Sequence, residues 1–285
     1  MASGDRLPIQ VALVSLVESL SPSLQDVRDA LQIQLRRDFA PVWGIDAEVT
    51  SYPAGALSVP AGSWMLHIVD DEKALSRLEP QRDPDGIPLP GLHLETPAGA
   101  PQAHVLLDRP DGEGQQGAAS LSDGQTWSIV ASHELLEMLV NPHCNRTAWR
   151  QSDRDSGEIE FFALEIADPC ESRGFEYSIH LDKQSVNTAA AADGVDIEVS
   201  DFVYPSWFWR LGKPPYHHNH GANLDSRIDA PFQIGRHSSV AVFTRGRGWF
   251  RRDSQGGDAD LPVRRGDQLT LSDCPDWIGT DWIGT

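Results

Sequence analysis

A histidine and two glutamates lie within about one turn of a predicted helix. Residues 132–138 read Ser-His-Glu-Leu-Leu-Glu-Met, and helical spacing places His133, Glu134, Glu137 and Asn141 on one narrow sector. The rest of the helix is mostly apolar, with Ile129, Val130, Ala131, Leu135, Leu136, Met138, Leu139 and Val140. Such a helix is buried, and ionisable groups that share its one polar sector need a partner because unpaired buried charge is costly. A divalent cation would suit a histidine and a glutamate one turn apart.

The spacing of these groups predicts hydrolytic metal chemistry. Positions i and i+4 stack on one face of a helix, so His133 and Glu137 can reach the same ion. Glu134 points slightly aside, where it could take a proton from a water that the ion coordinates. A solvated surface helix can show the same pattern by chance, but it would not carry leucine and valine on nearly every side.

A third ligand is expected downstream, within residues 163–171. Asp168 ends a predicted strand at a turn that Pro169 forces, and this would aim its carboxylate at a fixed point. The competing interpretation of Asp168 is an Asx-type turn cap. Three other side chains stay open as alternative ligands: Glu165, Glu171 and His143. Of these, Glu165 lies on an otherwise apolar strand, where it could equally face solvent.

The predicted elements upstream of the helix alternate between strands and one long helix. Strands are expected at 8–16, 46–52, 63–69 and 103–107, a helix between Ser21 and Gly44, and a Pro/Gly-rich loop at 79–101. The polar-sector helix itself spans about 126–140, where Asn141-Pro142 stops it. The second half is β-rich, with strands at 158–167 and 195–203 and an apolar aromatic strand at 204–209.

This order of elements resembles the amino-terminal half of the zincin metallopeptidases, over roughly residues 8–142. The resemblance implies that His133 and Glu137 bind zinc, that Glu134 is the general base, and that 103–107 is an edge strand holding extended peptide. Position 137 is glutamate where the family pattern has histidine. A carboxylate ligand lowers the net charge of the metal centre, so cations harder than zinc would also suit it.

The predicted fold class is α+β. A zincin-like domain with a mixed sheet and the metal-site helix is expected at 1–150. A β-rich second half at 151–229 would complete the site, and a small β-subdomain with a tail would occupy 230–285. The final ten residues repeat Asp-Trp-Ile-Gly-Thr, which we interpret as a frayed or docking tail.

Charge and composition exclude several classes of protein. The chain has 23 basic and 42 acidic side chains, a net charge of −19 that would repel the phosphates of nucleic acid. No apolar run approaches the roughly 18 residues of a membrane span. The apolar stretch 9–17 reads as a strand rather than a signal peptide, so we expect a cytoplasmic protein. The three cysteines favour free thiols, although Cys144 and Cys170 flank the site segments and could pair.

Two further clusters have ordinary interpretations. His217, His218 and His220 lie in a polar segment at 212–225, which we expect to be a solvated loop. Trp207, Phe208 and Trp209 are consecutive aromatics, for which core packing is the expected role and a substrate-binding wall the alternative.

The leading functional hypothesis is a metal-dependent hydrolase, a zinc peptidase or amidase that acts on a peptide or small amide. The second is a catalytically inactive zincin-like scaffold that serves as a binding or assembly protein. A third is that the second half carries an unrelated binding function and the helix is merely structural. A coordination sphere closed to water would favour the scaffold, and a protein that binds no metal would favour the third hypothesis.

Overall fold

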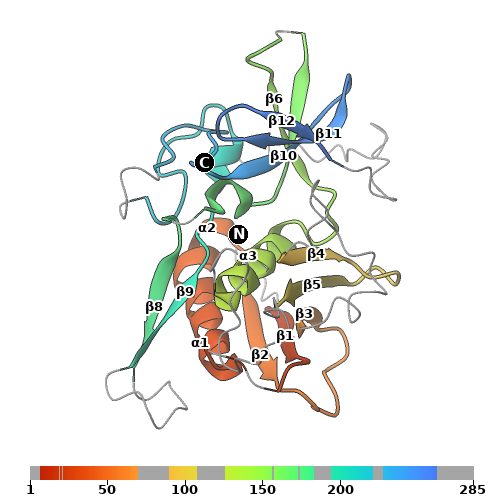
Figure 1. Ribbon diagram of the computed structural model, residues 1–285, viewed down its shortest axis with the longest axis vertical. Coiled ribbons are helices and arrows are strands. Elements are labelled where there is room, and N and C mark those ends of the chain that lie inside the picture. Colours follow the sequence, from red (N-terminus) through yellow and green to blue (C-terminus); the bar gives the residue numbers. More distant parts are fainter. Residues whose placement is uncertain are drawn as a thin grey trace, which may run out of the picture.

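A computed structural model gives the architecture of the chain. It describes residues 7–18, 20, 22–69, 90–107, 126–155, 157–172, 174–182, 194–220 and 227–261. Figure 1 shows the two five-stranded sheets one above the other, with the helices beside the lower sheet and the β8–β9 pair to the left. Among the described residues, no helix has the length and apolar character needed to cross a membrane.

The first sheet has five strands in the order β2-β1-β3-β5-β4. They are β1 (Ile9–Ser15), β2 (Ala47–Tyr52), β3 (Trp64–Val69), β4 (Gly91–Glu95) and β5 (Pro101–Leu106). Strands β1, β2, β3 and β5 are parallel, and β4 pairs with β5 in the antiparallel direction. The sheet is therefore mixed, and among the described residues its two outer strands are β2 and β4 (Figure 1).

A continuous helical segment joins β1 to β2. It comprises α1 (Leu24–Gln34), the π-helical turn η1 (Leu35–Phe39) and α2 (Ala40–Trp43). It begins at Ser23, whose side chain accepts the backbone N–H of Asp26, the arrangement of an N-cap. It ends at Gly44, whose φ of 65° is the left-handed conformation that glycine adopts without steric cost.

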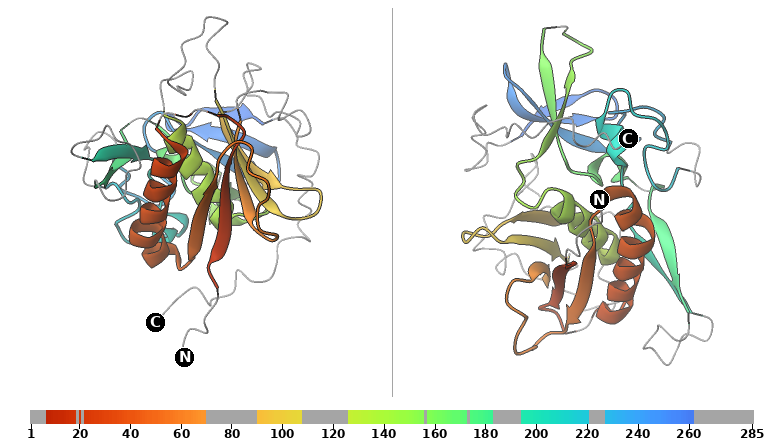
Figure 2. Two further views of the ribbon diagram at one scale, coloured as in Figure 1. Left: turned by 90° about the horizontal axis from the view of Figure 1, so that it is seen from below. Right: turned by 180° about the vertical axis from the view of Figure 1, so that it is seen from behind.

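Helix α3 (Trp127–Val140) is the buried helix that the sequence predicts. It packs on β4 and β5 of the first sheet, and the hairpin of β8 (Tyr177–Leu181) and β9 (Val195–Val199) lies against it and α1. Figure 2 shows α1 and α3 on the same side of the first sheet. Ser132 ties these layers together, because its hydroxyl donates to Gln34 and accepts the backbone N–H of Ser200. The polar sector of α3 is therefore held in a fixed orientation.

The second sheet is antiparallel, in the order β12-β11-β10-β7-β6. Its strands are β6 (Thr147–Gln151), β7 (Ile159–Ala163), β10 (Ser239–Thr244), β11 (Gly248–Asp253) and β12 (Asp258–Asp260). The side chains of Phe162, Val242 and Phe250 are buried in the same hydrophobic core as those of the first sheet. Because β10 pairs with β7, the expected boundaries at 150 and 229 both cut through this one sheet.

The predicted α+β class is confirmed, and several element bounds differ. The loop expected at 79–101 contains β4, and the predicted edge strand at 103–107 is the inner strand β5, which pairs on both sides. The prediction of an edge at 103–107 was therefore wrong. The strands near 163 and 199 end about four residues earlier than expected.

Two further predictions in the second half have an outcome. The prediction of an aromatic strand at 204–209 was wrong. This segment contains η3 (Pro205–Phe208), a turn of 3-10 helix that begins with proline and buries Trp207. Cys144 and Cys170 are both free, as the composition favoured. Cys274 and the repeated tail at 276–285 lie outside the described residues.

Candidate metal centre

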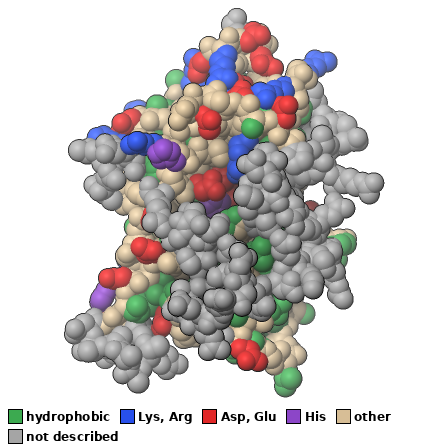
Figure 3. Space-filling model, in the orientation of Figure 1, with side chains coloured by type: hydrophobic (Ala, Val, Ile, Leu, Met, Phe, Trp, Pro, Cys, Tyr) green, Lys and Arg blue, Asp and Glu red, His purple; other side chains and the backbone are tan. Residues whose placement is uncertain are grey.

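Three segments far apart in the sequence meet at the polar sector of α3. The helix contributes His133, Glu134 and Glu137, β4 contributes His93, and the turn η2 (Asp168–Cys170) contributes Asp168. Only 4% of the Glu137 side chain and 13% of the His133 side chain are exposed. Figure 3 shows acidic side chains beside a histidine at the middle of the molecule, between the two sheets. The site is therefore a dense, nearly dry group of acids and imidazoles.

The residues predicted as ligands form the first grouping. Nε2 of His133 lies 3.3 Å from Oε1 of Glu137 and 3.5 Å from Oδ1 of Asp168. Ligands bonded to Zn²⁺ at about 2.0–2.2 Å with tetrahedral angles lie roughly 3.3–3.6 Å apart. The three ligand atoms all lie within 4.8 Å of one another, so they could hold one cation.

A second grouping surrounds His93, which the sequence analysis did not single out. Its Nδ1 lies 3.5 Å from Oε2 of Glu134 and 3.6 Å from Oε2 of Glu137, and its Nε2 lies 3.4 Å from Oε2 of Glu165. His93, Glu137 and Glu165 also satisfy the spacing for one cation. The sequence Leu92-His93-Leu94 has the alternation of a strand, but the proline and glycine residues around it favoured the prediction of a loop.

Backbone and amide groups hold the carboxylates in place. Oε1 of Glu137 accepts the backbone N–H groups of Ala167 and Asp168, at 3.1 and 3.2 Å. Nδ2 of Asn141 donates to Oε1 of Glu165 at 3.0 Å, which turns that carboxylate toward His93. Glu165 therefore faces the interior, and its alternative interpretation as a solvent-facing residue was wrong.

The remaining candidate ligands differ in position. Asp168 begins η2, and its carboxylate faces His133. His143 is exposed and pairs with Glu95 at 3.2 Å, which places it outside the two groupings. Burial raises the pKa of Glu171, and the nearby charge of Asp168 adds to that rise, so Glu171 borders the centre.

The electrostatics of the centre show an excess of acid. Burial raises the pKa of Glu137 to about 8; the His133 imidazole opposes this rise, and the Asp168 and Glu165 carboxylates add to it. Burial by itself lowers the pKa of His133, but the Glu137 and Asp168 carboxylates outweigh burial and raise it well above its usual value. The pKa of His93 is raised in the same way, with Glu165 foremost among the groups that oppose burial. Protons thus occupy the place that a cation would take, and cation binding would release them.

A glycine gives Glu134 its position. A Cβ built on Gly91 would lie 2.5 Å from Oε1 of Glu134 and 2.5 Å from Cγ1 of Val130. Because such distances are far inside van der Waals contact, only glycine lets β4 approach α3 this closely. The β4 backbone therefore confines the Glu134 carboxylate beside His93.

Cys170, Asp201 and His217 form a separate buried grouping with cation-compatible spacing. Nδ1 of His217 lies 2.6 Å from Oδ2 of Asp201, and Oδ1 of Asp201 accepts the backbone N–H groups of Phe202 and Asn219. The prediction that this histidine lies in a solvated loop was wrong, since His217 is 1% exposed. Because Cys170 ends η2, this network anchors the turn that carries Asp168.

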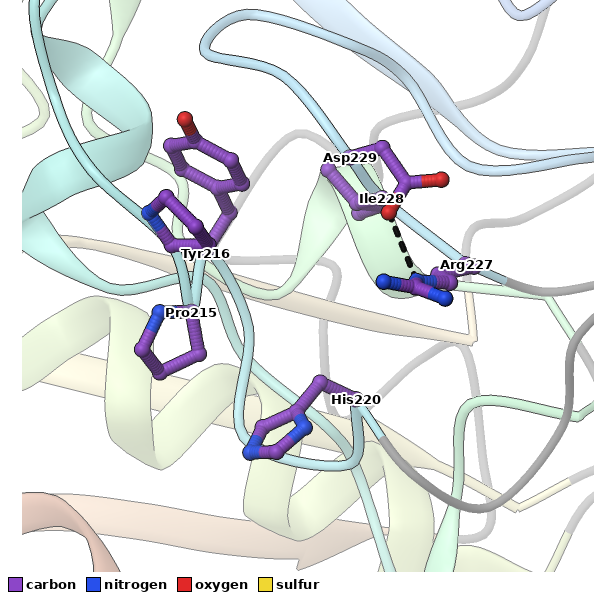
Figure 4. A pocket seen from close by; sticks show the side chains of 7 residues that line it. Pro215, Tyr216, His220, Arg227, Ile228 and Asp229 are labelled. Carbon is purple, nitrogen blue, oxygen red and sulfur yellow. Dashed lines mark ion pairs between the residues drawn. The ribbon is translucent and has the colours of Figure 1, made fainter.

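A surface pocket lies on the segment around residues 214–229. Figure 4 shows Pro215, Tyr216 and His220 on one side of it, with Arg227, Ile228 and Asp229 on the other. Nε of Arg227 pairs with Oδ1 of Asp229 at 2.6 Å, so the two charges in the pocket satisfy each other. The pocket shares no lining residue with the groupings around His133 and His93.

Comparison with known proteins found no matching family model, no similar curated protein and no similar solved structure. The structure brings His133, Glu134, Glu137 and Asp168 to one place, and their roles as ligands and base stay predictions. We therefore argue function from the geometry of the centre itself.

Proposed function

We propose that this protein is a metal-dependent hydrolase that cleaves a peptide or small amide bond. His133, Glu137 and Asp168 would hold the cation, and Glu134 would be the general base. The observation that carries the proposal is the 3.3 and 3.5 Å spacing of His133 Nε2 from carboxylates on two different elements. Neither carboxylate forms an ion pair with lysine or arginine among the described residues, so a cation is the missing partner.

Each side chain has a distinct part in this chemistry. A divalent cation in the grouping would lower the pKa of a coordinated water toward neutrality. Glu134 neighbours His133 in sequence, but its carboxylate faces His93 at 3.5 Å, beside the predicted ligands. From there Glu134 would accept a proton as the water oxygen bonds to the carbonyl carbon. It would return that proton to the amine nitrogen as the C–N bond breaks.

Zinc is the cation that we propose first. One imidazole and two carboxylates suit zinc, and they leave a position for water. Two carboxylates also suit harder cations such as Mn²⁺. The identity of the metal, like the substrate class, is therefore part of the proposal. The buried acidic groupings could hold a metal ion in either case.

Strand β4 is the proposed substrate edge, in place of 103–107. It is one of the two outer strands of the described sheet, it runs antiparallel to β5, and it carries His93 into the centre. An outer strand offers unpaired backbone N–H and C=O groups to an extended peptide. A peptide paired along β4 would pass directly beside Glu134, because Gly91 lies against that carboxylate.

The Glu134→Gln variant tests the proposal. Glutamine keeps the shape of the side chain but cannot accept the proton, so turnover of a peptide or amide library should fall at least about 100-fold. Metal content should not change, because Glu134 is outside the grouping around His133. Glu48→Gln, at an exposed position of β2 away from the centre, is the matched control and should keep full activity. Full activity in Glu134→Gln would overturn the proposal.

One observation favours a second candidate function, a scaffold with a structural metal. Oε1 of Glu137 already accepts two backbone N–H groups, so a cation there would fasten α3 to η2. A structural site has no position open to water. Azide or a hydroxamate added to the Co²⁺-loaded protein should change its visible absorption if the site is open. An unchanged spectrum would favour the scaffold.

A further inference from the structure

We infer that the centre binds two divalent cations, bridged by the carboxylate of Glu137. This inference deepens the proposed function and depends on it for the first cation, held by His133, Glu137 and Asp168. The second cation would lie between His93, Glu137 and Glu165, the grouping that surrounds β4. The structure brings both groupings together with only Glu137 in common.

The two oxygens of Glu137 face different imidazoles. Oε1 lies 3.3 Å from Nε2 of His133, and Oε2 lies 3.6 Å from Nδ1 of His93. A carboxylate that gives one oxygen to each ion holds them a few ångströms apart, and paired catalytic metals lie about 3.5–4 Å apart. The backbone N–H groups of Ala167 and Asp168 fix the plane of this carboxylate, so the bridge is oriented before any ion arrives.

His93 is an independent sign of a second ligand site. The residue is 7% exposed, and its Nε2 makes no hydrogen bond among the described residues. This nitrogen lies 3.4 Å from Oε2 of Glu165, close to the separation of two ligands on one ion. A buried ring nitrogen without a hydrogen bond is costly, and a cation bound by Nε2 and by Oε2 of Glu165 would remove that cost. An imidazole binds one ion through one nitrogen, so Nδ1 would stay outside the coordination sphere and face Glu134.

The charges of the centre also favour more than one cation. Glu134, Glu137 and Asp168 have only histidines as ion-pair partners among the described residues. When the imidazoles are neutral ligands, these three carboxylates carry three negative charges. One divalent cation leaves one of these charges uncompensated in a buried site, so a second cation beside the first would be stabilised.

The stoichiometry of binding is the first test. We expect the chelator-stripped protein to bind two equivalents of Zn²⁺ in a calorimetric titration, with the same result from native mass spectrometry. His93→Ala and His133→Ala should each bind one equivalent, and Glu137→Gln should weaken both sites. His180→Ala is the matched control, because His180 is exposed and pairs with Asp196 away from the centre. It should bind two.

The bridge is tested with Mn²⁺ as the probe. Two ions on one carboxylate are magnetically coupled, so electron paramagnetic resonance of the doubly loaded protein should lose the signal of isolated Mn²⁺. His93→Ala, loaded with one equivalent, should restore that signal. Isolated Mn²⁺ signal in the doubly loaded wild-type protein would overturn the bridge. Circular dichroism of each variant shows whether it is folded.

The outcomes separate this inference from the proposed function. A single equivalent in the wild-type protein, unchanged in His93→Ala, would overturn the second site, while loss of turnover in Glu134→Gln would still support the hydrolase. Two coupled ions without hydrolysis would support the bridged centre and count against the hydrolase. No bound metal would overturn both.

Discussion

Two buried glutamates show how differently this protein treats the same side chain. Glu160 in β7 is 1% exposed and pairs with Arg150 at 2.9 Å and Arg252 at 2.8 Å. Burial alone raises the pKa of Glu160, but the two guanidinium groups outweigh burial and lower it. Glu137 in α3 is as deeply buried, yet its ion-pair partners are histidines and its pKa rises to about 8.

The comparison separates a carboxylate whose cationic partners are arginines from one whose partners are histidines. In the second sheet, the chain supplies the cations itself, and the ion pairs hold β6, β7 and β11 together. At α3, the sequence places acids and imidazoles together but pairs Glu137 with no arginine or lysine among the described residues. Buried charge without an arginine or lysine partner is expensive, and this is why we propose a cation beside Glu137.

Glu160→Gln should have the largest effect on folding. Removing the charge leaves Arg252 and Arg150 without their shared buried partner, and breaking a buried pair costs about 3–5 kcal/mol. Urea unfolding of the wild-type protein and the variant measures this loss. Glu48→Gln, at an exposed pair with a separation of 4.0 Å, is the control and should change stability by less than about 1 kcal/mol. A similarly small effect for Glu160→Gln would show that the buried ion pairs of Glu160 stabilise the fold no more than an exposed pair does.

Removal of the metal should have the next largest effect. A cation that binds only the folded protein stabilises it by about 2.7 kcal/mol at a hundred times its dissociation constant. Unfolding with Zn²⁺ and with a chelator should therefore give different free energies for the wild-type protein. Glu137→Gln should reduce this difference, while Glu160→Gln should leave it unchanged. Equal metal-dependent stabilisation in the Glu137 variant would count against Glu137 as a ligand.

Gly91→Ala should disturb the base more than the metal. The added methyl group meets the Glu134 carboxylate and Val130, so Glu134 must move. We expect turnover to fall at least about tenfold through misplacement of the base, with metal content retained. Gly246→Ala is the control away from the centre, because its new Cβ would meet only Oε1 of Glu158, at the ordinary contact distance of 3.5 Å. Unchanged kinetics in Gly91→Ala would remove the support that β4 gives to the proposed base.

Acid should destabilise the protein through Glu160, with a smaller effect. The pKa of Glu160 is lower in the folded protein than its usual value. The ion pairs of Glu160 therefore stabilise the fold in full at pH values above the usual pKa. The stabilisation is lost as the pH falls through the lowered pKa. Below pH 5, the midpoint temperature of thermal unfolding should therefore fall less steeply with decreasing pH in Glu160→Gln than in the wild-type protein. Parallel pH profiles would contradict this assignment.

The sequence predicts the parts of the site that depend on local pattern. Helical spacing is enough to locate the polar sector of α3, because most of the residues on its other faces are apolar. The turn that Pro169 forces is enough to indicate Asp168. Neither the position of His93 nor that of His217 could be predicted, because each depends on long-range contacts. His93 reaches the centre only through the pairing of β4 with β5, and His217 is buried only because Asp201 faces it.

The metal content of the purified protein tests the central claim most directly. Elemental analysis should find at least one equivalent of a divalent cation per chain after gel filtration, or after loading with Zn²⁺ or Mn²⁺. His133→Ala should contain about one equivalent less, while His180→Ala should match the wild-type protein. A wild-type protein that retains no cation under any of these conditions, or a His133→Ala variant with unchanged content, would contradict the account.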